Sequence, residues 1–274
     1  MMQSVDTASI ILAAGFGTRM KGFSGNKILL PLVPGPDPYT GDRPIIAEIV
    51  KNLPEGPKAL VVHHRKDQVI EATRKWGIAY CDQPIPNGTG GALIATQGFM
   101  EGIDETNLII TMGDVPFVQA ATYANLFRQL SNHNLVVLGF RPRAKARYGV
   151  LEIENGTVKR IIEWAYWNEF PREIQRGFEI CNSGIYAAKR STVLEYFDRL
   201  KEKPHRVKKA RAGKMVTVEE YFITDLIQLL HDDGFRVGFI IAEQEQEVMG
   251  IDTLEDLMLA QGIFAKRQRQ AKRF

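Results

Sequence analysis

Short hydrophobic runs recur along the chain, each bounded by glycine, proline or polar residues. They predict strands at 8–14, 58–64, 77–81, 107–112, 134–140 and 235–241. Amphipathic stretches between the first five runs predict helices near 44–52, 66–75, 90–100 and 119–131. In the last of these, Ala120, Ala124, Phe127 and Leu130 are spaced to share one helix face. Near-continuous apolar strands that alternate with helices predict an α/β fold whose mostly parallel sheet is covered on both faces.

The pattern changes after residue 140. The stretches VLEIE and TVKRIIE flank Asn155-Gly156, which is a strong signal for a β-hairpin. A further strand at 178–189, helices near 191–200 and 217–231, and a final helix near 252–264 complete the prediction, and the proline-rich segment 31–44 is expected to be a loop. We therefore expect one domain over residues 1–262, with a first half typical of nucleotide binding (about 1–135), an accessory second half (136–262) and a basic tail (263–274).

Composition narrows the class of protein. The chain has 274 residues, of which 45% are hydrophobic and 24% charged, an ordinary balance for a globular protein. Its net charge of +3 is too small to indicate nucleic-acid binding, although the segments 201–214 and 265–274 are basic. No apolar stretch approaches the roughly 20 residues that span a bilayer, so no membrane partner is expected. The sequence predicts no particular oligomeric state.

Cysteine usage and the N-terminus bear on location. The only two cysteines, Cys81 and Cys181, make neither a disulfide framework nor a zinc-ligand spacing, which fits a reducing cytoplasm. Cys181 lies in an apolar strand and is expected to be a packed core thiol. The first residues lack the cationic segment of a secretory signal. We therefore expect a cytoplasmic protein.

The first predicted strand ends in a glycine turn with cations. In LAAGFGTRM, Gly15 and Gly17 follow the strand and leave room for the backbone to approach a phosphate. A dinucleotide fingerprint would need glycine where Met20 stands, and the P-loop motif is absent. Arg19 and Lys27 could bind a polyanion, but taken alone the stretch is a weak signal, and an ordinary turn with surface cations is the favoured explanation at this point.

Two aspartates are candidate metal ligands. Asp114, in MGDVP, follows a probable central strand, where a carboxylate could hold magnesium beside phosphates. The alternative is an ordinary turn aspartate before a proline. Asp252, in MGIDTLED, precedes a predicted helix, and Glu255 stands three residues later as in a capping box. A helix cap is therefore a competing interpretation of Asp252, although a capping residue can also bind a metal.

The segment DQPIPNGTGGAL (82–93) leads from a strand into a helix. Gly88, Gly90 and Gly91 are expected to leave backbone exposed, and Thr89 offers a hydroxyl. The amide of Gln83 could recognise a base, because it both donates and accepts hydrogen bonds. A glycine turn that merely starts a helix explains the segment as well. No histidine pair has a metal-ligand spacing, and no nucleophile elbow is present.

Taken in order, these motifs resemble the sugar-nucleotide pyrophosphorylase family of nucleotidyltransferases. Within it the sequence is most similar to the uridylyltransferase domains of the bacterial N-acetylglucosamine-1-phosphate uridylyltransferases. The matching segments span residues 10–252 and are LAAGFGTRM with Lys27, QPIPNGTGGAL, MGDVPF, YGVLEIENGTVKRIIE, EICNSGIYA, EYFITDLI and EVMGID. One segment alone would indicate only a nucleotidyltransferase, whereas seven in the right order are much more specific.

The resemblance implies a role for each matching residue. Arg19 and Lys27 would be the catalytic residues that bind the triphosphate, and Asp114 and Asp252 would hold Mg²⁺. The nucleotide would contact Leu12, Ala13, Ala14, Gly15, Gly17, Gln83, Gly88 and Thr89. The sugar would contact Gly149, Glu163, Asn182 and Thr224. The implied fold is a Rossmann-like, mostly parallel mixed sheet with an inserted β-hairpin that binds the sugar.

The implied reaction joins UTP and a sugar 1-phosphate, most simply N-acetylglucosamine 1-phosphate, to give a UDP-sugar and pyrophosphate. The sugar phosphate would attack the α-phosphorus in line. A phosphate monoester needs no general base to act as a nucleophile, so catalysis would consist of positioning and charge neutralisation. The same chemistry on glucose 1-phosphate, TTP or CTP stays open, as does a catalytically silent protein that binds nucleotide sugars.

The sequence departs from the family at several positions. Asn26 stands where proline usually precedes the lysine, and Met112 and Phe222 replace common tyrosines, which leaves the sugar less certain than the reaction. Asp252 replaces an asparagine that is usual in this subfamily. The chain stops near residue 274, before the hexapeptide-repeat acetyltransferase domain of the bifunctional enzymes would begin, so we expect no acetyl transfer.

Overall fold

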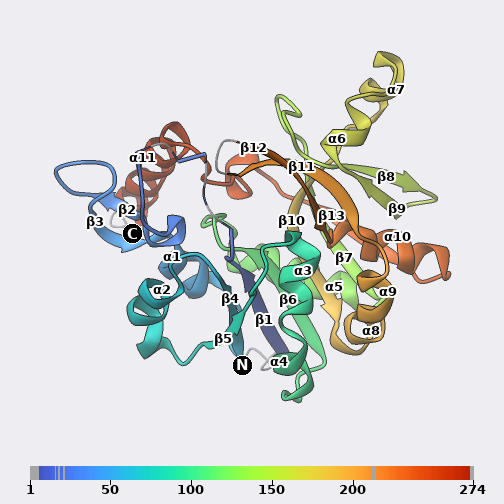
Figure 1. Cartoon of the computed structure of the whole chain (residues 1–274), viewed down its shortest axis with the longest axis horizontal. Helices are drawn as coiled ribbons and strands as arrows, with labels where there is room; N and C mark the ends of the chain where they lie inside the picture. Colours follow the sequence, from blue (N-terminus) through green and yellow to red (C-terminus); the bar gives the residue numbers. More distant parts are fainter. Residues whose placement is uncertain (1–5, 16, 18, 21, 212–213, 272–274) are drawn as a thin grey trace.

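The computed structural model describes residues 6–271 except 16, 18, 21, 212 and 213, and it contains a central sheet with helices on both faces (Figure 1). Parts of the predicted glycine turn, basic segment and tail therefore lie outside the described residues. The sheet has the strand order β13-β7-β10-β6-β1-β4-β5, and the hairpin β8–β9 joins it through β10. Its strands are β1 (Thr7–Leu12), β4 (Lys58–Val62), β5 (Ala79–Asp82), β6 (Asn107–Met112), β7 (Leu135–Phe140), β8 (Val150–Glu154), β9 (Thr157–Ile162), β10 (Cys181–Lys189) and β13 (Val237–Ile241).

The strands that matter for the site run parallel and end together. β1 lies between β6 and β4, with Leu12 opposite Met112 on one side and Val61 on the other. β10 runs antiparallel between β6 and β7, which makes the sheet mixed. The loops after β1, β4, β5 and β6 consequently emerge at one edge, where ligands bind in sheets of this kind. The predicted α/β class is confirmed.

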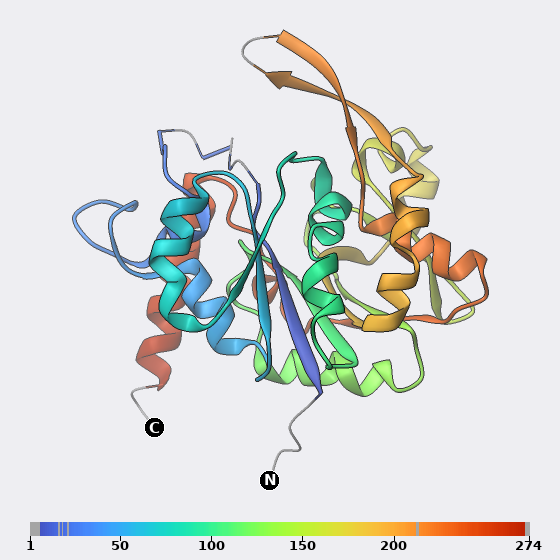
Figure 2. The same cartoon turned by 60° about the horizontal axis from the view of Figure 1, so that its bottom comes forward.

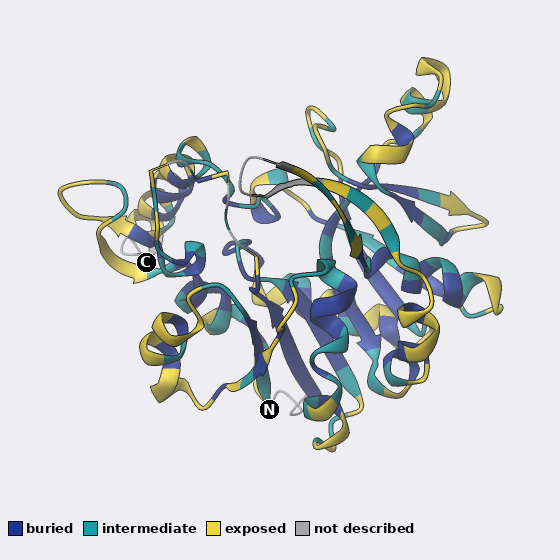
Figure 3. Cartoon of the chain, viewed as in Figure 1, coloured by how far each residue is buried: buried dark blue, intermediate teal, exposed yellow. Residues whose placement is uncertain are grey.

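Helices cover the two faces of the sheet, and the core is correspondingly divided. Ile10 and Ile11, neighbours in β1, are both fully buried but belong to opposite cores, which is why the strand is apolar throughout. One face carries α1 (Ile45–Asn52), α2 (Lys66–Thr73), α5 (Ala120–Leu130) and α11 (Leu254–Ala271). The other carries α3 (Gly88–Ile94), α4 (Gln97–Glu101), α8 (Arg190–Glu195), α9 (Phe197–Lys201) and α10 (Thr224–Asp232). Figure 3 shows the buried residues gathered in this sandwich.

Several elements differ from the prediction. The buried face of α5 consists of Tyr123, Leu126 and Leu130, whereas Ala120 and Ala124 are exposed. The prediction was right for Leu130 and Phe127, which pack in or against the core, and wrong for the two alanines, because alanine gains little from burial and the larger side chains determine which face of the helix is buried. α11 continues past residue 264 to Ala271. Helices α6 (Trp164–Trp167) and α7 (Arg172–Gly177) were not predicted, and the loop at 31–44 contains the ribbon β2 (Pro31–Pro34)–β3 (Gly41–Pro44).

The basic segment 201–214 lies largely in a two-stranded ribbon. β11 (His205–Arg211) pairs antiparallel with β12 (Lys214–Glu220), and the ribbon projects from the body of the molecule (Figure 2). The helix expected over 217–231 therefore begins only at Thr224. Cys81 and Cys181 are both buried and free, which confirms the packed thiol expected at Cys181. Among the described residues, none of the helices combines the length and the apolar character needed to cross a bilayer.

Candidate active site

Three loops converge at the carboxyl edge of β1 and β6. The N–H of Gly113 donates to the carbonyl of Leu12 at 2.9 Å. A Cβ at Gly113 would lie 2.7 Å from the Cβ of Ala13 and 3.2 Å from the side chain of Ile28, so only glycine fits where these segments meet. The N–H of Ile251 donates to the carbonyl of Asp114 at 3.0 Å, which holds the loop before α11 against the loop after β6. These contacts bring the two candidate metal-binding segments together.

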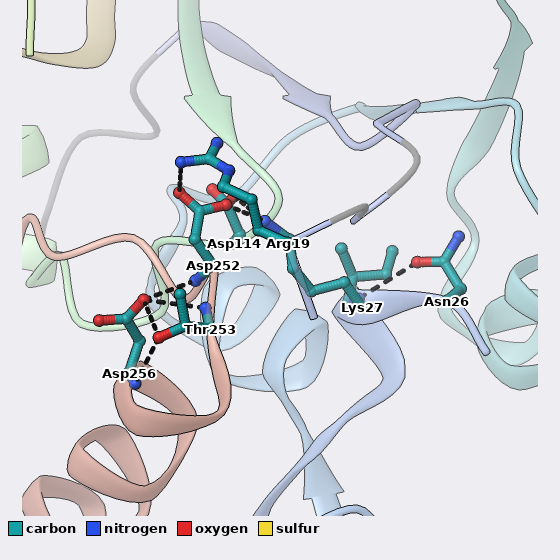
Figure 4. A network of polar contacts seen from close by, with 8 residues as sticks. Arg19, Asn26, Lys27, Asp114, Asp252, Thr253 and Asp256 are labelled. Carbon is teal, nitrogen blue, oxygen red and sulfur yellow. Dashed lines mark hydrogen bonds and ion pairs between the residues drawn. The ribbon is translucent and has the colours of Figure 1, made fainter. Parts of the chain in front are cut away.

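The four charged residues singled out at these loops form one network (Figure 4). The ammonium of Lys27 lies 2.5 Å from Asp114 Oδ2 and 2.8 Å from Asp252 Oδ1. Arg19 Nη1 lies 2.9 Å from Asp252 Oδ2. The structure thus joins both predicted catalytic residues to both predicted metal ligands, although they are separated by up to 233 positions between Arg19 and Asp252.

Burial distinguishes the members of this network. The side chain of Lys27 is 13% exposed and that of Asp114 19%, whereas Arg19 is 67% exposed. Burial lowers the pKa of Lys27, but the two aspartates raise it by more, so its net pKa lies above the usual 10.5. The lysine therefore stays charged across the physiological range. The formal charges of the two cations and two anions cancel, so the pair of carboxylates is already neutralised by protein groups.

Asp252 is not the cap of the helix that follows it. α11 begins at Leu254, and Thr253 Oγ1 accepts from the N–H of Asp256 at 3.2 Å. In return, Asp256 Oδ2 accepts from the N–H of Thr253 at 2.9 Å, which completes a capping box one residue later than the sequence suggested. Asp256 Oδ2 also accepts from the N–H of Asp252 at 3.1 Å. The interpretation of Asp252 and Glu255 as the capping pair was wrong, and the Asp252 carboxylate is left to bind cations.

The donor set fits a divalent cation. Two carboxylates already hold one cationic nitrogen between them at 2.5 and 2.8 Å. Mg²⁺ bound beside a nucleotide typically takes one or two carboxylates and completes its shell with phosphate oxygens and water. In the described part of the chain, no three or more His, Cys, Asp and Glu side chains are grouped so that they could hold a metal ion by themselves. The residues suit an ion that arrives with a phosphate ligand.

The backbone beside this network leaves space at Gly15. Leu12, Ala13 and Ala14 are buried, and the N–H of Ala13 donates to the carbonyl of Val61 at 3.1 Å. A Cβ at Gly15 would meet no described atom within 4 Å, whereas Gly17 adopts a left-handed φ of +61° and packs against the Lys27 stem. The end of the strand predicted to bind the nucleotide therefore carries small residues and has unoccupied space beside Gly15.

The second predicted nucleotide segment follows β5. Gln83 is buried, and its Nε2 donates to Asn87 Oδ1 at 2.9 Å and to the carbonyl of Gly88 at 3.1 Å. Its carbonyl oxygen has no hydrogen-bond donor among the described residues. Since both amide hydrogens are occupied, the group that Gln83 can offer a base is an acceptor.

The glycines of this segment also have a packing role. Gly88 has a φ of +95°, and a Cβ there would lie 2.4 Å from the carbonyl oxygen of Tyr221. Gly90 is buried and donates to that carbonyl at 2.8 Å. Thr89 Oγ1 accepts from the N–H of Ile223 at 3.2 Å. The expectation that Gly90 and Gly91 expose backbone was wrong, because both glycines are buried.

The four predicted sugar-binding residues also lie together. The N–H of Asn182 donates to the carbonyl of Gly149 at 2.8 Å. A Cβ at Gly149 would lie 3.5 Å from Glu163 Oε2, and Thr224 Oγ1 donates to Glu163 Oε1 at 2.9 Å. Asn182 Nδ2 donates to the hydroxyl of Tyr186 at 2.8 Å. Burial raises the pKa of Glu163 above its usual 4.5, while the bond from Thr224 works in the opposite direction.

Sequence reasoning missed a neighbouring polar chain. His205 Nε2 lies 2.7 Å from Asp225 Oδ2, and its Nδ1 lies 2.9 Å from the hydroxyl of Tyr166. The imidazole stacks on Phe222 with ring centroids 4.4 Å apart. Asp225 follows Thr224 directly, so this chain borders the predicted sugar residues. The only feature of the sequence that pointed to these contacts was Phe222, which stands where the family commonly has a tyrosine.

Met112 ends β6 beside the predicted sugar residues. A Cβ at Gly184 would lie 3.0 Å from Met112 Cγ, so the methionine packs against the bulge of β10 that follows Asn182. An apolar side chain therefore stands where the family usually offers a phenolic hydroxyl.

A nucleotide-type sheet with cations and paired carboxylates at its carboxyl edge defines a nucleotidyltransferase-like class of protein. The chain belongs to the family of MobA-like NTP transferase domains, whose model matches residues 9–203. Among curated relatives, it is 29% identical over 271 residues to the "Bifunctional protein GlmU" of Novosphingobium aromaticivorans, covering 96% of this chain and 54% of that protein. It is 30% identical over 277 residues to the protein of the same name from Rhodopseudomonas palustris strain BisB5, covering 98% and 55%. The chain thus spans about half the length of these relatives.

Solved structures agree on the fold. The UDP-N-acetylglucosamine pyrophosphorylase of Trypanosoma brucei superposes with a TM-score of 0.71 at 14% identity, covering 94% of this chain and 65% of that one. A putative glucose-1-phosphate thymidylyltransferase from Bacillus anthracis superposes with a TM-score of 0.64 at 18% identity, covering 94% and 95%. The resemblance to sugar-nucleotide pyrophosphorylases is confirmed at the level of the family and the fold.

Proposed function

We propose that this chain joins UTP to N-acetylglucosamine 1-phosphate, giving UDP-N-acetylglucosamine and pyrophosphate. The observation that carries the proposal is the network in which Lys27 and Arg19 meet Asp114 and Asp252 at the carboxyl edge of the sheet. Cations for a triphosphate and carboxylates for its metal are thereby presented at one point. The similarity to curated proteins named GlmU over nearly the whole chain supports the choice of sugar and nucleotide.

The network suggests how the chain's own groups act. With only protein present, Lys27 neutralises the carboxylates; with nucleotide bound, its ammonium is released to the triphosphate. Arg19, whose side chain is 67% exposed, can exchange its ion pair with Asp252 for contacts with the outer phosphates. Asp114 and Asp252 would hold Mg²⁺. That ion, when bound, neutralises phosphate charge and acts as a Lewis acid. The protein's task is to bring two anions together in line, so positioning and charge neutralisation account for the catalysis.

Selectivity for base and sugar has separate sources. The carbonyl oxygen of Gln83 is an acceptor, which suits the N3–H of uracil or thymine and disfavours cytosine, whose N3 is itself an acceptor. At the hydroxyl and N-acetyl groups of the sugar, the carboxylate of Glu163 would accept hydrogen bonds and the amide of Asn182 would donate them. The buried, free thiols of Cys81 and Cys181 are compatible with a reducing cytoplasm, where we place the reaction.

The proposal is tested by a substrate panel. The protein is incubated with MgCl₂, each of the four ribonucleoside triphosphates or TTP, and a set of sugar 1-phosphates, and pyrophosphate is measured. We expect release with UTP and N-acetylglucosamine 1-phosphate above every other pair. Release from no pair, with UDP-sugar still bound, would show a silent binding protein instead. Release with TTP and glucose 1-phosphate but not with UTP would refute the uridylyl assignment.

Glu163→Gln is expected to raise KM for the sugar 1-phosphate about 10-fold or more, because a hydrogen bond to a charged group contributes about 1.5–3 kcal/mol. The same change should stabilise the fold at neutral pH. Burial raises the pKa of Glu163, so the native state holds its proton more tightly and loses stability as pH rises from 4.5 through the raised pKa. Glutamine does not titrate, and the Tm of the variant relative to wild type should therefore increase over that window.

The matched control is Glu152→Gln on the same hairpin. Glu152 pairs with Arg160 at 2.6 Å but lies outside the predicted sugar residues. It should leave KM for the sugar 1-phosphate unchanged. If Glu163→Gln leaves this KM at the wild-type value, Glu163 does not bind the sugar.

A further inference from the structure

Asn26 is almost fully buried directly before Lys27, and both ends of its side-chain amide are bonded. It is 3% exposed. Its Oδ1 accepts from the N–H of Ile28 at 3.1 Å, and its Nδ2 donates to the carbonyl of His64 at 2.7 Å (Figure 4 shows the first bond). Because both of its hydrogen-bonding groups are satisfied, this buried amide is held in one conformation, directly before the predicted catalytic lysine.

The hydrogen bond from Ile28 to Asn26 stabilises the helical turn that begins at Lys27. Asn26 has an extended backbone, with φ −88° and ψ 127°, and its side chain caps the 3₁₀ helix η1 (Lys27–Leu29). The carbonyl of Asn26 also accepts from the N–H of Leu29 at 3.0 Å. Asparagine is among the preferred residues for starting a helical turn because its oxygen satisfies an otherwise unpaired N–H. The turn therefore begins at Lys27 because Asn26 precedes it.

The second bond fastens that turn to the sheet. His64 follows β4, which lies between β1 and β5 in the sheet. On the other side of the turn, Ile28 packs against Gly113, where a Cβ would lie 3.2 Å from its side chain. The base of Lys27 is thus held between the ends of β4 and β6, and β6 is the strand that leads into Asp114.

We propose that Asn26 is a positioning residue for Lys27. It fixes the backbone from which the lysine extends, so that the ammonium alternates between the two aspartates and the phosphates of a bound triphosphate. A lysine side chain carries much rotamer freedom, and a displaced base would increase the cost of placing its charge. This inference rests on the proposed function, since it assigns Asn26 a part in the same triphosphate site.

A double-mutant cycle separates positioning from a merely structural role. Asn26→Ala is expected to lower kcat/KM for the nucleotide about 10- to 100-fold, the scale of loss when a catalytic group is displaced by about 1 Å. KM for the sugar 1-phosphate should be unchanged. In a Lys27→Ala background, the same Asn26→Ala change should cost less than twofold in kcat/KM, while lowering Tm as much as it does in wild type.

The outcomes that would overturn the proposal are equally specific. A loss of the same size in both backgrounds would mean that Asn26 does not act through Lys27, and an unchanged kcat/KM in Asn26→Ala would mean that it does not act at all. Asn26→Asp keeps the acceptor for Ile28 but loses the donor to His64, so its kcat/KM should fall between those of wild type and Asn26→Ala. A wild-type value would remove the role given to the His64 bond.

The matched control is Asn107→Ala at the opposite end of β6. Asn107 Nδ2 donates to the carbonyl of Asp6 at 3.0 Å, a comparable amide-to-carbonyl bond remote from the site. It should leave kcat/KM unchanged. The cycle is repeated on the Kd for UTP with MgCl₂, measured by calorimetry, which requires no turnover. If no substrate pair releases pyrophosphate, the proposed function fails, whereas the coupling between Asn26 and Lys27 in UTP binding is still decided.

Discussion

Replacing Asp114 by asparagine is expected to lower the rate of pyrophosphate release by about 10²–10³-fold or more, the effect of losing one preorganised electrostatic contact. Asparagine has the same shape but brings no charge to a divalent cation. The backbone bond between Asp114 and Ile251, which joins the two loops, does not involve the side chain and should persist. The fold is therefore expected to survive the substitution, so a lower rate would result from a change at the active site and not from unfolding.

Two measurements make the Asp114 prediction decisive. Stopped-time pyrophosphate assays at saturating MgCl₂ give the rate, and a thermal melt verifies the fold. Asp198→Asn is the control, because Asp198 pairs with Lys201 at 3.0 Å in an exposed position on α9. Its rate should match wild type. If Asp114→Asn retains most of its rate, Asp114 is not the metal ligand, and the proposed role of the network is wrong.

The fold could be predicted from sequence because its physical cause is local. Parallel strands buried on both faces must be apolar throughout, and β6 was predicted with its observed limits, Asn107–Met112. The resemblance implied that Arg19, Lys27, Asp114 and Asp252 belong to one site, and the rule that loops after parallel strands share one edge agrees with it for the loops after β1 and β6. Glycine turns and acidic residues in those loops could therefore be expected to meet.

The remaining features depend on contacts between distant segments or on a choice between equal patterns. The helix start at α11 offers two boxes, one with Asp252 and Glu255 and one with Thr253 and Asp256, and spacing alone does not choose between them. Gly90 packs against Tyr221, more than a hundred positions away. A local sequence pattern cannot predict such a contact. The bond from Asn26 to His64 likewise joins two loops that are adjacent only once the sheet has formed.

Lys27→Met is expected to reduce the rate by about 10²–10³-fold and to change how stability depends on Mg²⁺ and pH. Asp114 and Asp252 both lie within 2.8 Å of the Lys27 ammonium. Methionine preserves much of the apolar stem but leaves these two carboxylates facing each other with only the exposed Arg19 as a partner for Asp252. Like charges at short range raise the pKa of at least one carboxyl. The variant should therefore lose stability, relative to wild type, as pH rises from about 4 towards neutrality.

Adding MgCl₂ should recover this stability, because an ion that binds the native carboxylates raises Tm by mass action. In wild type the Lys27 ammonium competes for the same oxygens, so its Tm should respond less. Lys201→Met, which breaks the exposed pair with Asp198, should show the wild-type response to both pH and Mg²⁺. Equal Mg²⁺ responses in Lys27→Met and wild type would mean that the two aspartates do not share a cation. A rate within tenfold of wild type would mean that Lys27 does not neutralise the triphosphate. The two readouts are independent, so the metal site and the catalytic lysine can each fail without the other.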